Sequence, residues 1–220
     1  MTLTTHHAHV TAATALAVQF ASKSVPTAQR TAPTTRVPDP INFQKWIDAN
    51  RHLLRPPVGN QYLYCGDDFI VMVIGGPNTR NDFHVNTTEE WFYQVKGDIA
   101  VRIREQGPDG PRMRDVVIRE GETWLCPSLV PHRPQRPADT VGLVIERQRP
   151  EGDVDHLVFY CDTCGDLVHD AEFHMKDIVV HFAQIMDEFW GGPVAKRTCR
   201  KCGKVVERAK PYEMKGLLLG

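Results

Sequence analysis

Hydrophobic and polar residues alternate along the middle of the chain, which is the pattern of β-strands buried on one face. These runs are rich in β-branched and aromatic residues and are separated by Gly-Pro and Pro-Asp-Gly turns. The runs that we expect to be strands cover residues 69–74, 90–95, 99–104, 113–118 and 141–146. Residues 108–111, Pro-Asp-Gly-Pro, are expected to form the tip of a hairpin. The pattern predicts an all-β dominated fold, either a sandwich or a barrel.

Two other segments have the period of an amphipathic helix. Phe43, Trp46 and Ile47 are spaced as a short helix at the start of the strand-rich part. A second helix is expected after Asp177 and before the Gly-Gly-Pro run at 191–193. Its apolar positions are Ile178, Phe182, Ile185, Met186 and Phe189. This stripe could line a subunit contact, but it more simply forms the core of a small C-terminal subdomain.

Three possible metal ligands, His84, Glu90 and His132, lie in the strand-rich part. In the strand that begins at Glu90, alternation places this carboxylate on the same face as Phe92. A lone buried carboxylate loses hydration without compensation unless a partner such as a cation replaces it. Two imidazoles and one carboxylate suit a divalent iron with open positions for substrate and oxygen, which favours an oxygenase. Glu89 competes with Glu90 as the ligand, and either histidine taken alone could be an ordinary loop residue.

The surrounding sequence resembles the paired metal-binding motifs of the cupin superfamily. The interval from Glu90 to Gly97 and the run from Gly121 to His132 fit those motifs. The second histidine of the first motif is replaced by Asn86, so three ligands remain instead of four. The resemblance implies a cupin, a jelly-roll β-barrel. The prolines that flank His132 predict a rigid loop that presents it.

Four cysteines form a second candidate metal site: Cys161, Cys164, Cys199 and Cys202. Each C-x-x-C pair lets two thiolates reach one ion, and the glycine that follows each pair permits a tight knuckle turn. Four sulfurs favour zinc or iron in a closed tetrahedron, which would stabilise the tail rather than catalyse. The alternatives are disulfides or independent redox dithiols. The remaining cysteines, at positions 65 and 126, are expected to be single core thiols.

Two arginines lie near the candidate metal ligands. Arg80 precedes His84 by four residues, and Arg136 follows His132 by four. A guanidinium can clamp a carboxylate through two parallel hydrogen bonds, so the pair indicates an anionic substrate. Alternatively, both arginines are solvent-facing loop charges.

Glu146 stands out because it lies in an otherwise apolar strand. A carboxyl group in this position should be paired or have a raised pKa, and either property suits proton transfer. The simpler alternative is a salt bridge to Arg147 or Arg149 at the end of the strand.

Together these features make residues 41–204 resemble the single-cupin 3-hydroxyanthranilate 3,4-dioxygenase family, whose members carry a rubredoxin-like tail. The matching segments are Phe43-x-x-Trp46-Ile47, Pro56-Pro57-Val58-Gly59-Asn60, Gly75-Gly76-Pro77-Asn78, Arg80-x3-His84-x5-Glu90, His132-x2-Gln135-Arg136-Pro137, the run from Leu143 to Pro150, and both C-x-x-C knuckles. They span about three quarters of the chain.

The resemblance implies extradiol-type opening of 3-hydroxyanthranilate by O2 to 2-amino-3-carboxymuconate semialdehyde, a precursor of quinolinate and NAD in the kynurenine pathway. It also implies Fe(II) at the catalytic site and a second iron or zinc at the four cysteines. The implied site residues are His84, Glu90 and His132 for the catalytic iron, Arg80 for O2, and Glu90, Arg136 and Glu146 for the substrate.

The expected domain organisation has four parts. The first 38 residues contain no Asp or Glu and many Thr and Ala, which cannot specify a packed domain, so residues 1–40 are expected to be a disordered extension. Residues 41–155 would form the cupin barrel, residues 156–208 the rubredoxin-like tail and residues 209–220 a flexible end. A length of 220 residues allows one good core plus a small appendage. The family is commonly dimeric, which makes a homodimer possible.

The net charge and the cysteines indicate which binding partners and which cellular compartment we expect. The net charge of −1 argues against binding to nucleic acid or to an anionic membrane. No apolar run approaches the roughly 20 residues that span a bilayer. Reduced cysteines suit a reducing compartment, so we expect a cytoplasmic protein. Two non-enzymatic alternatives stay open, namely a cupin that binds an aromatic acid without catalysis, and a metal sensor that uses the four cysteines.

Overall fold

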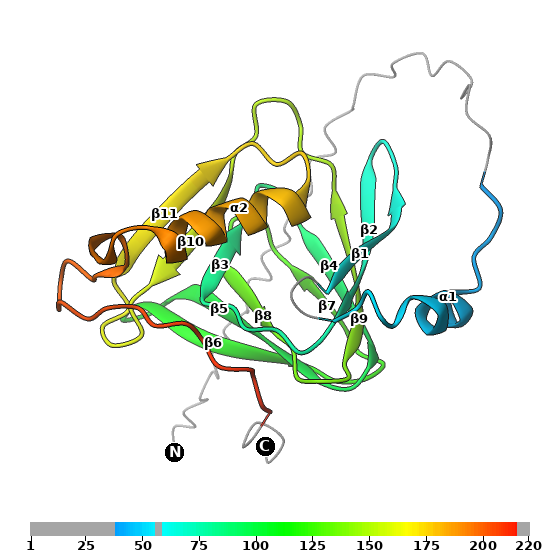
Figure 1. Ribbon diagram of the computed structural model, residues 1–220, viewed down its shortest axis with the longest axis horizontal. Coiled ribbons are helices and arrows are strands. Elements are labelled where there is room, and N and C mark those ends of the chain that lie inside the picture. Colours follow the sequence, from blue (N-terminus) through cyan, green and yellow to red (C-terminus); the bar gives the residue numbers. More distant parts are fainter. Residues whose placement is uncertain (1–37, 56–58, 215–220) are drawn as a thin grey trace, which may run out of the picture. The chain divides into compact units, whose positions relative to one another are not determined.

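The computed structural model describes residues 38–55 and 59–214 (Figure 1). All helices and strands given below belong to the unit that spans residues 42–220. Most of the expected N-terminal extension, residues 1–37, lies outside the described residues, as do residues 215–220 of the expected flexible end. Neither α-helix of the described part has the length and hydropathy that would be needed to cross a membrane.

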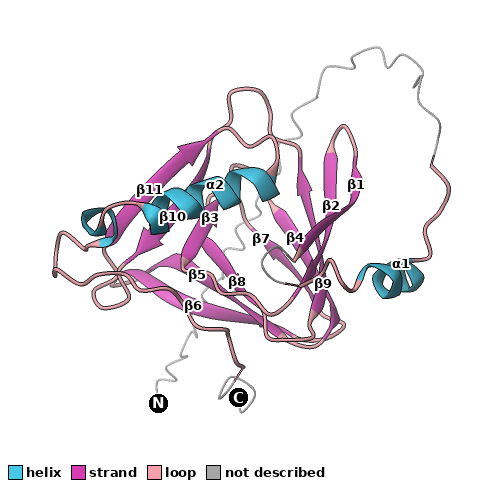
Figure 2. Ribbon diagram, in the orientation of Figure 1, coloured by secondary structure: helices cyan, strands magenta, loops and turns pink. Residues whose placement is uncertain are grey.

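The described residues form eleven strands and two α-helices (Figure 2). The helices are α1 (Phe43–Asn50) and α2 (Ile178–Gly191), followed by a 3-10 helix at Val194–Arg197. The strands are β1 (Asn60–Cys65), β2 (Phe69–Gly75), β3 (Asp82–Val85), β4 (Glu90–Lys96), β5 (Ile99–Gly107), β6 (Gly110–Ile118), β7 (Thr123–Cys126), β8 (His132–Gln135), β9 (Val141–Arg147), β10 (Asp155–Tyr160) and β11 (Leu167–Phe173). Both expected helices and all five expected strands are confirmed.

Strands β2 to β9 are divided between two antiparallel sheets, and consecutive strands lie in different sheets except for the hairpin partners β5 and β6. One sheet has the order β1-β2-β9-β4-β7, and the other has the order β11-β10-β3-β8-β5-β6. Eight strands that pair as β2-β9-β4-β7 and β3-β8-β5-β6 form a jelly roll, so the expected cupin fold is confirmed. The expected hairpin between β5 and β6 is confirmed, but its tip is shorter than expected, because Gly110 and Pro111 already pair with β5.

Two features differ from the expectation. His132 does not lie in a rigid loop but is the first residue of β8, where it pairs with His84 of β3. The chain after Asp155 also continues the barrel sheet, because β10 pairs with β3 and β11 pairs with β10. The expected boundary between barrel and tail therefore falls at the start of a strand that belongs to the six-stranded sheet.

The core lies between the sheets and extends to helix α2. In β4 the even-numbered residues from Glu90 to Gln94 are buried, as alternation predicts. Ile178, at the start of α2, packs into the same core, and Phe182 contacts it from the next turn. These two residues hold the start of α2 against the barrel, whereas Met186 and Phe189 of the same stripe pack in a separate cluster in the expected C-terminal part.

Candidate metal centre and its surroundings

Three buried side chains from both sheets meet inside the barrel. His84 of β3 and His132 of β8 come from one sheet, and Glu90 of β4 comes from the other. Glu90 Oε1 lies 3.2 Å from His84 Nδ1 and 3.3 Å from His132 Nε2. One ligand atom from each residue lies within 4.8 Å of the others. The structure therefore brings the three expected ligands together, in an arrangement that can hold a metal ion.

The hydrogen bonds of the two histidines fit a metal site. His84 Nε2 lies 2.7 Å from Asp155 Oδ2, and His132 Nδ1 lies 2.9 Å from the carbonyl oxygen of Val130. Both partners accept hydrogen bonds, so the other ring nitrogen can present its lone pair toward Glu90. Ligating histidines commonly donate their second N–H to a carboxylate or a backbone carbonyl in this way.

Asn86 occupies the position at which the cupin motif carries its second histidine. Its Nδ2 donates a hydrogen bond of 2.9 Å to Glu90 Oε1. An amide nitrogen with two hydrogens has no lone pair to offer a metal, so Asn86 orients the carboxylate through this contact instead. The ligand set is therefore two histidines and one glutamate, which leaves open positions on a bound ion.

Burial and the contacts among these side chains shift their pKa values in opposite directions. Burial alone would raise the pKa of Glu90, but His132 and His84 hold it well below its usual range. Burial alone would lower the pKa of both histidines. Asp155 and Glu90 instead raise the pKa of His84, and Glu90 raises the pKa of His132 well above its usual value. The cluster thus favours a positive charge beside Glu90, which a divalent cation can supply in place of the imidazole protons.

Glu146 of β9 lies directly across the sheet from Glu90 and is 1% exposed. Its Oε2 accepts a hydrogen bond of 2.6 Å from Arg149, which also binds Asp155 at 2.8 and 2.9 Å. Burial and the charge of Glu90 raise the pKa of Glu146 to about 7, although Arg149 opposes them. The expected pairing and the expected raised pKa are therefore both present. Arg149 also links Glu146 to the carboxylate that holds His84.

The two arginines singled out in the sequence have different surroundings. Arg136 is 1% exposed, and Nη1 of its guanidinium donates a long hydrogen bond of 3.4 Å to Gln94 Oε1. Its Nε and Nη2 have no hydrogen-bond partner among the described residues. Burial and the charge of Arg80 lower the pKa of Arg136 to about 10. The alternative of a solvent-facing loop charge is wrong for Arg136, which presents an unpaired guanidinium edge.

Arg80 is instead paired and lies close to helix α2. Its guanidinium forms hydrogen bonds with both carboxylate oxygens of Asp82. It also lies 5.2 Å from the ring centre of Phe182, whose ring packs edge-on against His84. These contacts fix the direction of the Arg80 charge beside the cluster.

A cavity of about 30 Å³ adjoins the three ligands. This exceeds the roughly 10–15 Å³ that one water molecule requires. Arg80 and Glu146 line the cavity, whereas Arg136 does not. The apolar part of its wall consists of Met72, Ile74, Phe92, Pro134, Val144, Ile178 and Phe182. The open side of the cluster therefore faces a mainly apolar space with one cationic and one carboxylic side chain.

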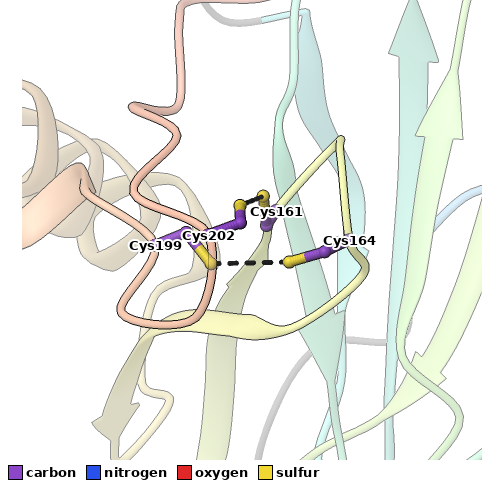
Figure 3. A group of neighbouring side chains, drawn as sticks. All are labelled: Cys161, Cys164, Cys199 and Cys202. Carbon is purple, nitrogen blue, oxygen red and sulfur yellow. Dashed lines mark hydrogen bonds between the residues drawn. The ribbon is translucent and has the colours of Figure 1, made fainter.

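The four cysteines form a separate cluster beyond β10 (Figure 3). The Sγ atoms of Cys161 and Cys202 lie 3.5 Å apart, and so do the Sγ atoms of Cys164 and Cys199. All four thiols are free, so the disulfide alternative is wrong. The four sulfurs lie within 4.8 Å of one another, and together they can fill a tetrahedral site without leaving an open position.

The two knuckles share one backbone geometry. Gly165 N donates to the carbonyl of Cys161 at 2.8 Å, and Gly203 N donates to the carbonyl of Cys199 at 2.9 Å. Both glycines have a positive φ, +71° and +75°, which other residues rarely adopt. Of the two cysteines expected to be core thiols, Cys126 is buried as predicted. Cys65 is exposed at the end of edge strand β1, so that prediction is wrong.

Three residues of the centre were missed in the sequence. Asp155 holds His84 from 71 positions away, and nothing local marks it except that an apolar run follows it. The helical spacing of Phe182 predicts only a place in the core stripe of its helix, although its ring also packs on His84. Arg149 entered only as a possible partner of Glu146, and its second bond to Asp155 depends on strand β10.

A jelly roll with a two-histidine, one-glutamate cluster inside it defines a cupin with a potential metal centre. Comparison with known proteins makes the class specific, because residues 36–190 match the family of 3-hydroxyanthranilic acid dioxygenase. The chain belongs to this family.

Curated relatives with the same family name align with this chain over most of their length. The chain is 44% identical to 3-hydroxyanthranilate 3,4-dioxygenase of Neurospora crassa, covering 76% of this chain and 90% of the relative. It is 48% identical to the protein of that name in Burkholderia cenocepacia, covering 76% of this chain and 92% of the relative. A third relative of that name, from Jannaschia sp., is 46% identical, with 79% of this chain and 94% of the relative covered.

Proposed function

We propose that this chain opens the aromatic ring of 3-hydroxyanthranilate with O2 to give 2-amino-3-carboxymuconate semialdehyde. Membership of the dioxygenase family and the names of the relatives support this reaction. The observation that carries the proposal is the buried cluster of His84, Glu90 and His132 beside a cavity. A non-catalytic binding protein would not require a ligand set with open positions.

In this proposal His84, Glu90 and His132 hold Fe(II), which matches two imidazoles and one carboxylate. Fe(II), when bound, supplies the redox chemistry that allows dioxygen to react with an electron-rich ring. Asp155 and the Val130 carbonyl keep the two imidazoles in the ligating tautomer.

Arg136 is the proposed partner of the substrate carboxylate. Its unpaired Nε and Nη2 form one edge of the guanidinium, the geometry that donates two parallel hydrogen bonds to a carboxylate. A β-carbon at Gly142 would lie 2.8 Å from Arg136 Nη1, so the glycine leaves room for this side chain. Because Arg136 does not line the 30 Å³ cavity, an aromatic acid that reaches both the cluster and Arg136 requires this cavity to enlarge.

Glu146 is the proposed proton acceptor. Its Oε1 has no hydrogen-bond partner among the described residues, and the pKa of about 7 lets the carboxyl exchange a proton near neutral pH. It would receive a proton from the hydroxyl or amino group of the substrate. Glu90 would also contact the substrate. Arg80 would contact dioxygen, where its charge stabilises the negative charge that develops on oxygen.

The proposal also covers the second metal site, the cellular compartment, the oligomeric state and the pathway. The four cysteines would hold iron or zinc as a structural ion, because all ligand positions are filled by sulfur. We place the enzyme in the cytoplasm, where thiols stay reduced, and allow for a homodimer. The product would cyclise to quinolinate without an enzyme, which places the reaction in the kynurenine pathway toward NAD.

The test is anaerobic loading with Fe(II), followed by 3-hydroxyanthranilate and then air. Stoichiometric oxygen uptake, with a rise in the near-ultraviolet absorbance of the semialdehyde, is expected only with iron. Tight binding of the acid without uptake would instead identify a binding cupin. If neither is seen, a metal-sensing role of the four cysteines becomes the better proposal.

A further inference from the structure

A second and larger cavity, about 260 Å³, lies on the outer face of the six-stranded sheet. Side chains of β8 separate it from the metal centre, because successive residues of a strand point to opposite faces. His132 and Pro134 line the cavity at the metal centre, whereas Arg133 and Gln135 line the second cavity. The two cavities are therefore back to back across this strand, and Arg80 lines both of them.

Arg133 is the unusual residue of the second cavity. It is 7% exposed, yet within the described part of the chain its side chain donates only to neutral oxygens, those of the Asn81 carbonyl at 3.1 Å and the Gln135 side chain at 3.4 Å. Its Nε has no partner among the described residues. The guanidinium lies 4.8 Å from the ring centre of Phe83. Burying a cation in this way is costly unless an anion accompanies it.

The charges nearby do not supply that anion. Burial is the main reason that the pKa of Arg133 is lowered, and the charge of Arg102 adds to the effect. Asp82 and Asp162 act in the opposite direction without outweighing it. Asp82 is already bonded to Arg80, so it cannot serve as a dedicated partner.

The opposite wall of the cavity comes from the C-terminal segment, residues 207–212. Asn81 fixes this segment, because its Nδ2 donates to the Glu207 carbonyl at 3.0 Å and its Oδ1 accepts from Ala209 N at 2.8 Å. The segment brings Arg208 and Lys210 to the cavity. The charged side chains that line the cavity are the cations Arg80, Arg133, Arg208 and Lys210 and the carboxylates Asp162 and Glu207. Cations outnumber carboxylates on this wall by two.

We propose that this second cavity binds a small ligand carrying an oxyanion, either a phosphate or a carboxylate. Arg133 supplies the buried cation that the anion would neutralise, its Nε has no hydrogen-bond partner among the described residues, and Lys210 contacts the anion from the C-terminal segment. The unpartnered buried hydroxyl of Tyr212 offers a further donor in the same wall. A volume of 260 Å³ suits a compact metabolite rather than a large cofactor. Binding would tie the C-terminal segment to the barrel.

The experiment is calorimetric titration of the full-length, metal-loaded protein with inorganic phosphate and, separately, with succinate at constant ionic strength. We expect one saturable site per chain for at least one probe, and the tighter probe identifies the anion class. Arg133→Gln should weaken binding about tenfold or more, because charge-assisted hydrogen bonds are lost. Arg119→Gln, which changes an exposed arginine outside the cavity, should leave binding unchanged.

Lys210→Gln is the second test variant, because Arg133→Gln changes a buried side chain and could lose binding through a folding defect. Lys210 is exposed, so this change should weaken binding severalfold while the melting temperature stays the same. Saturable binding of neither probe would overturn the proposal, as would unchanged affinity in both the Arg133 and Lys210 variants. So would binding that is lost in Arg136→Gln but retained in Arg133→Gln, since it would place the anion inside the barrel. These readouts do not depend on turnover, so they can fail independently of the dioxygenase proposal.

Discussion

The barrel cluster and the four-cysteine cluster both gather their ligand atoms within 4.8 Å, but their surroundings differ. The barrel cluster has three ligands of two chemical kinds, all buried, and it opens onto a cavity with charged side chains. The cysteine cluster has four ligands of one kind, on two loops with matching glycine turns, and Cys202 is exposed.

This difference separates a site that can react from a site that can only bind. A closed tetrahedron of sulfur has no position for a substrate, whereas three ligands leave positions open. The barrel ligands also have supporting partners such as Asp155 and Asn86, which orient them but do not fill the open side. The comparison predicts that damage to one cluster abolishes turnover and that damage to the other reduces stability.

The largest effect is expected from His84→Ala. Removing one of three ligands should abolish metal retention in the barrel and lower turnover by more than about 100-fold, since even the loss of a supporting partner costs 10–100-fold. The metal at the cysteines should remain. Oxygen uptake and metal content per chain measure this, with the exposed His52→Ala as control. Normal turnover in the His84 variant would remove this residue from the centre.

Cys199→Ala should have the converse effect. Cys199 is 1% exposed, and a metal bound to its cluster would contribute to folding, so the melting temperature should fall by about 10 °C. Turnover per bound barrel iron should change little at low temperature. Cys65→Ala is the matched control, because that thiol is exposed and outside the cluster. Loss of turnover at full barrel iron content would argue that the cysteines take part in the reaction.

Arg136→Lys tests the substrate side of the barrel. A lysine keeps the charge but cannot form two parallel bonds, so KM should rise about 10–100-fold while iron content stays constant. The exposed Arg119→Lys serves as control. An unchanged KM would mean that the unpaired edge of Arg136 does not meet the substrate.

The smallest expected effect is the pH dependence of the reaction. The pKa of Glu146 is raised to about 7, so the carboxyl is protonated below that pH and cannot accept a proton. If Glu146 is the acceptor, kcat/KM should fall about tenfold per pH unit below the midpoint and be flat above it. A bound cation favours the carboxylate, so the midpoint in the loaded enzyme should lie at or below 7.

The control for this dependence is Glu146→Gln, which keeps the shape of the side chain. Its kcat/KM should be low and should lack the break near neutral pH. A break of the same position and size in this variant would assign the titration to another group. Iron content must be measured at each pH, because the histidine ligands also bind protons.

Most residues of the two metal sites could be predicted from the sequence, because the patterns that mark them involve neighbouring residues. Strand alternation from Glu90, the glycine turns and the C-x-x-C spacing each depend on neighbouring residues. The replacement of the second motif histidine by Asn86 was also visible, and it predicted a three-ligand set. Structure added the reason why that set is well oriented, which is the bond from Asn86 to Glu90.

The missing parts depend on pairing between distant segments. Strand β10 has the short apolar run Leu157 to Phe159, which also suits a helix or a buried loop, so its pairing with β3 was not predicted. Asp155 could not be linked to His84 without that pairing. The placement of His132 at the start of β8 was missed because Pro134 is buried within this short strand, where proline is uncommon.

We propose that the barrel cluster is the reaction centre and that the cysteine cluster is structural. The most direct measurement is selective removal of the barrel metal with a mild chelator while the metal at the cysteines is monitored. The account predicts that oxygen uptake with 3-hydroxyanthranilate falls to zero, that the melting temperature changes little, and that one equivalent of Fe(II) restores activity. Activity that persists without barrel metal, or that follows the metal at the cysteines instead, would contradict the account.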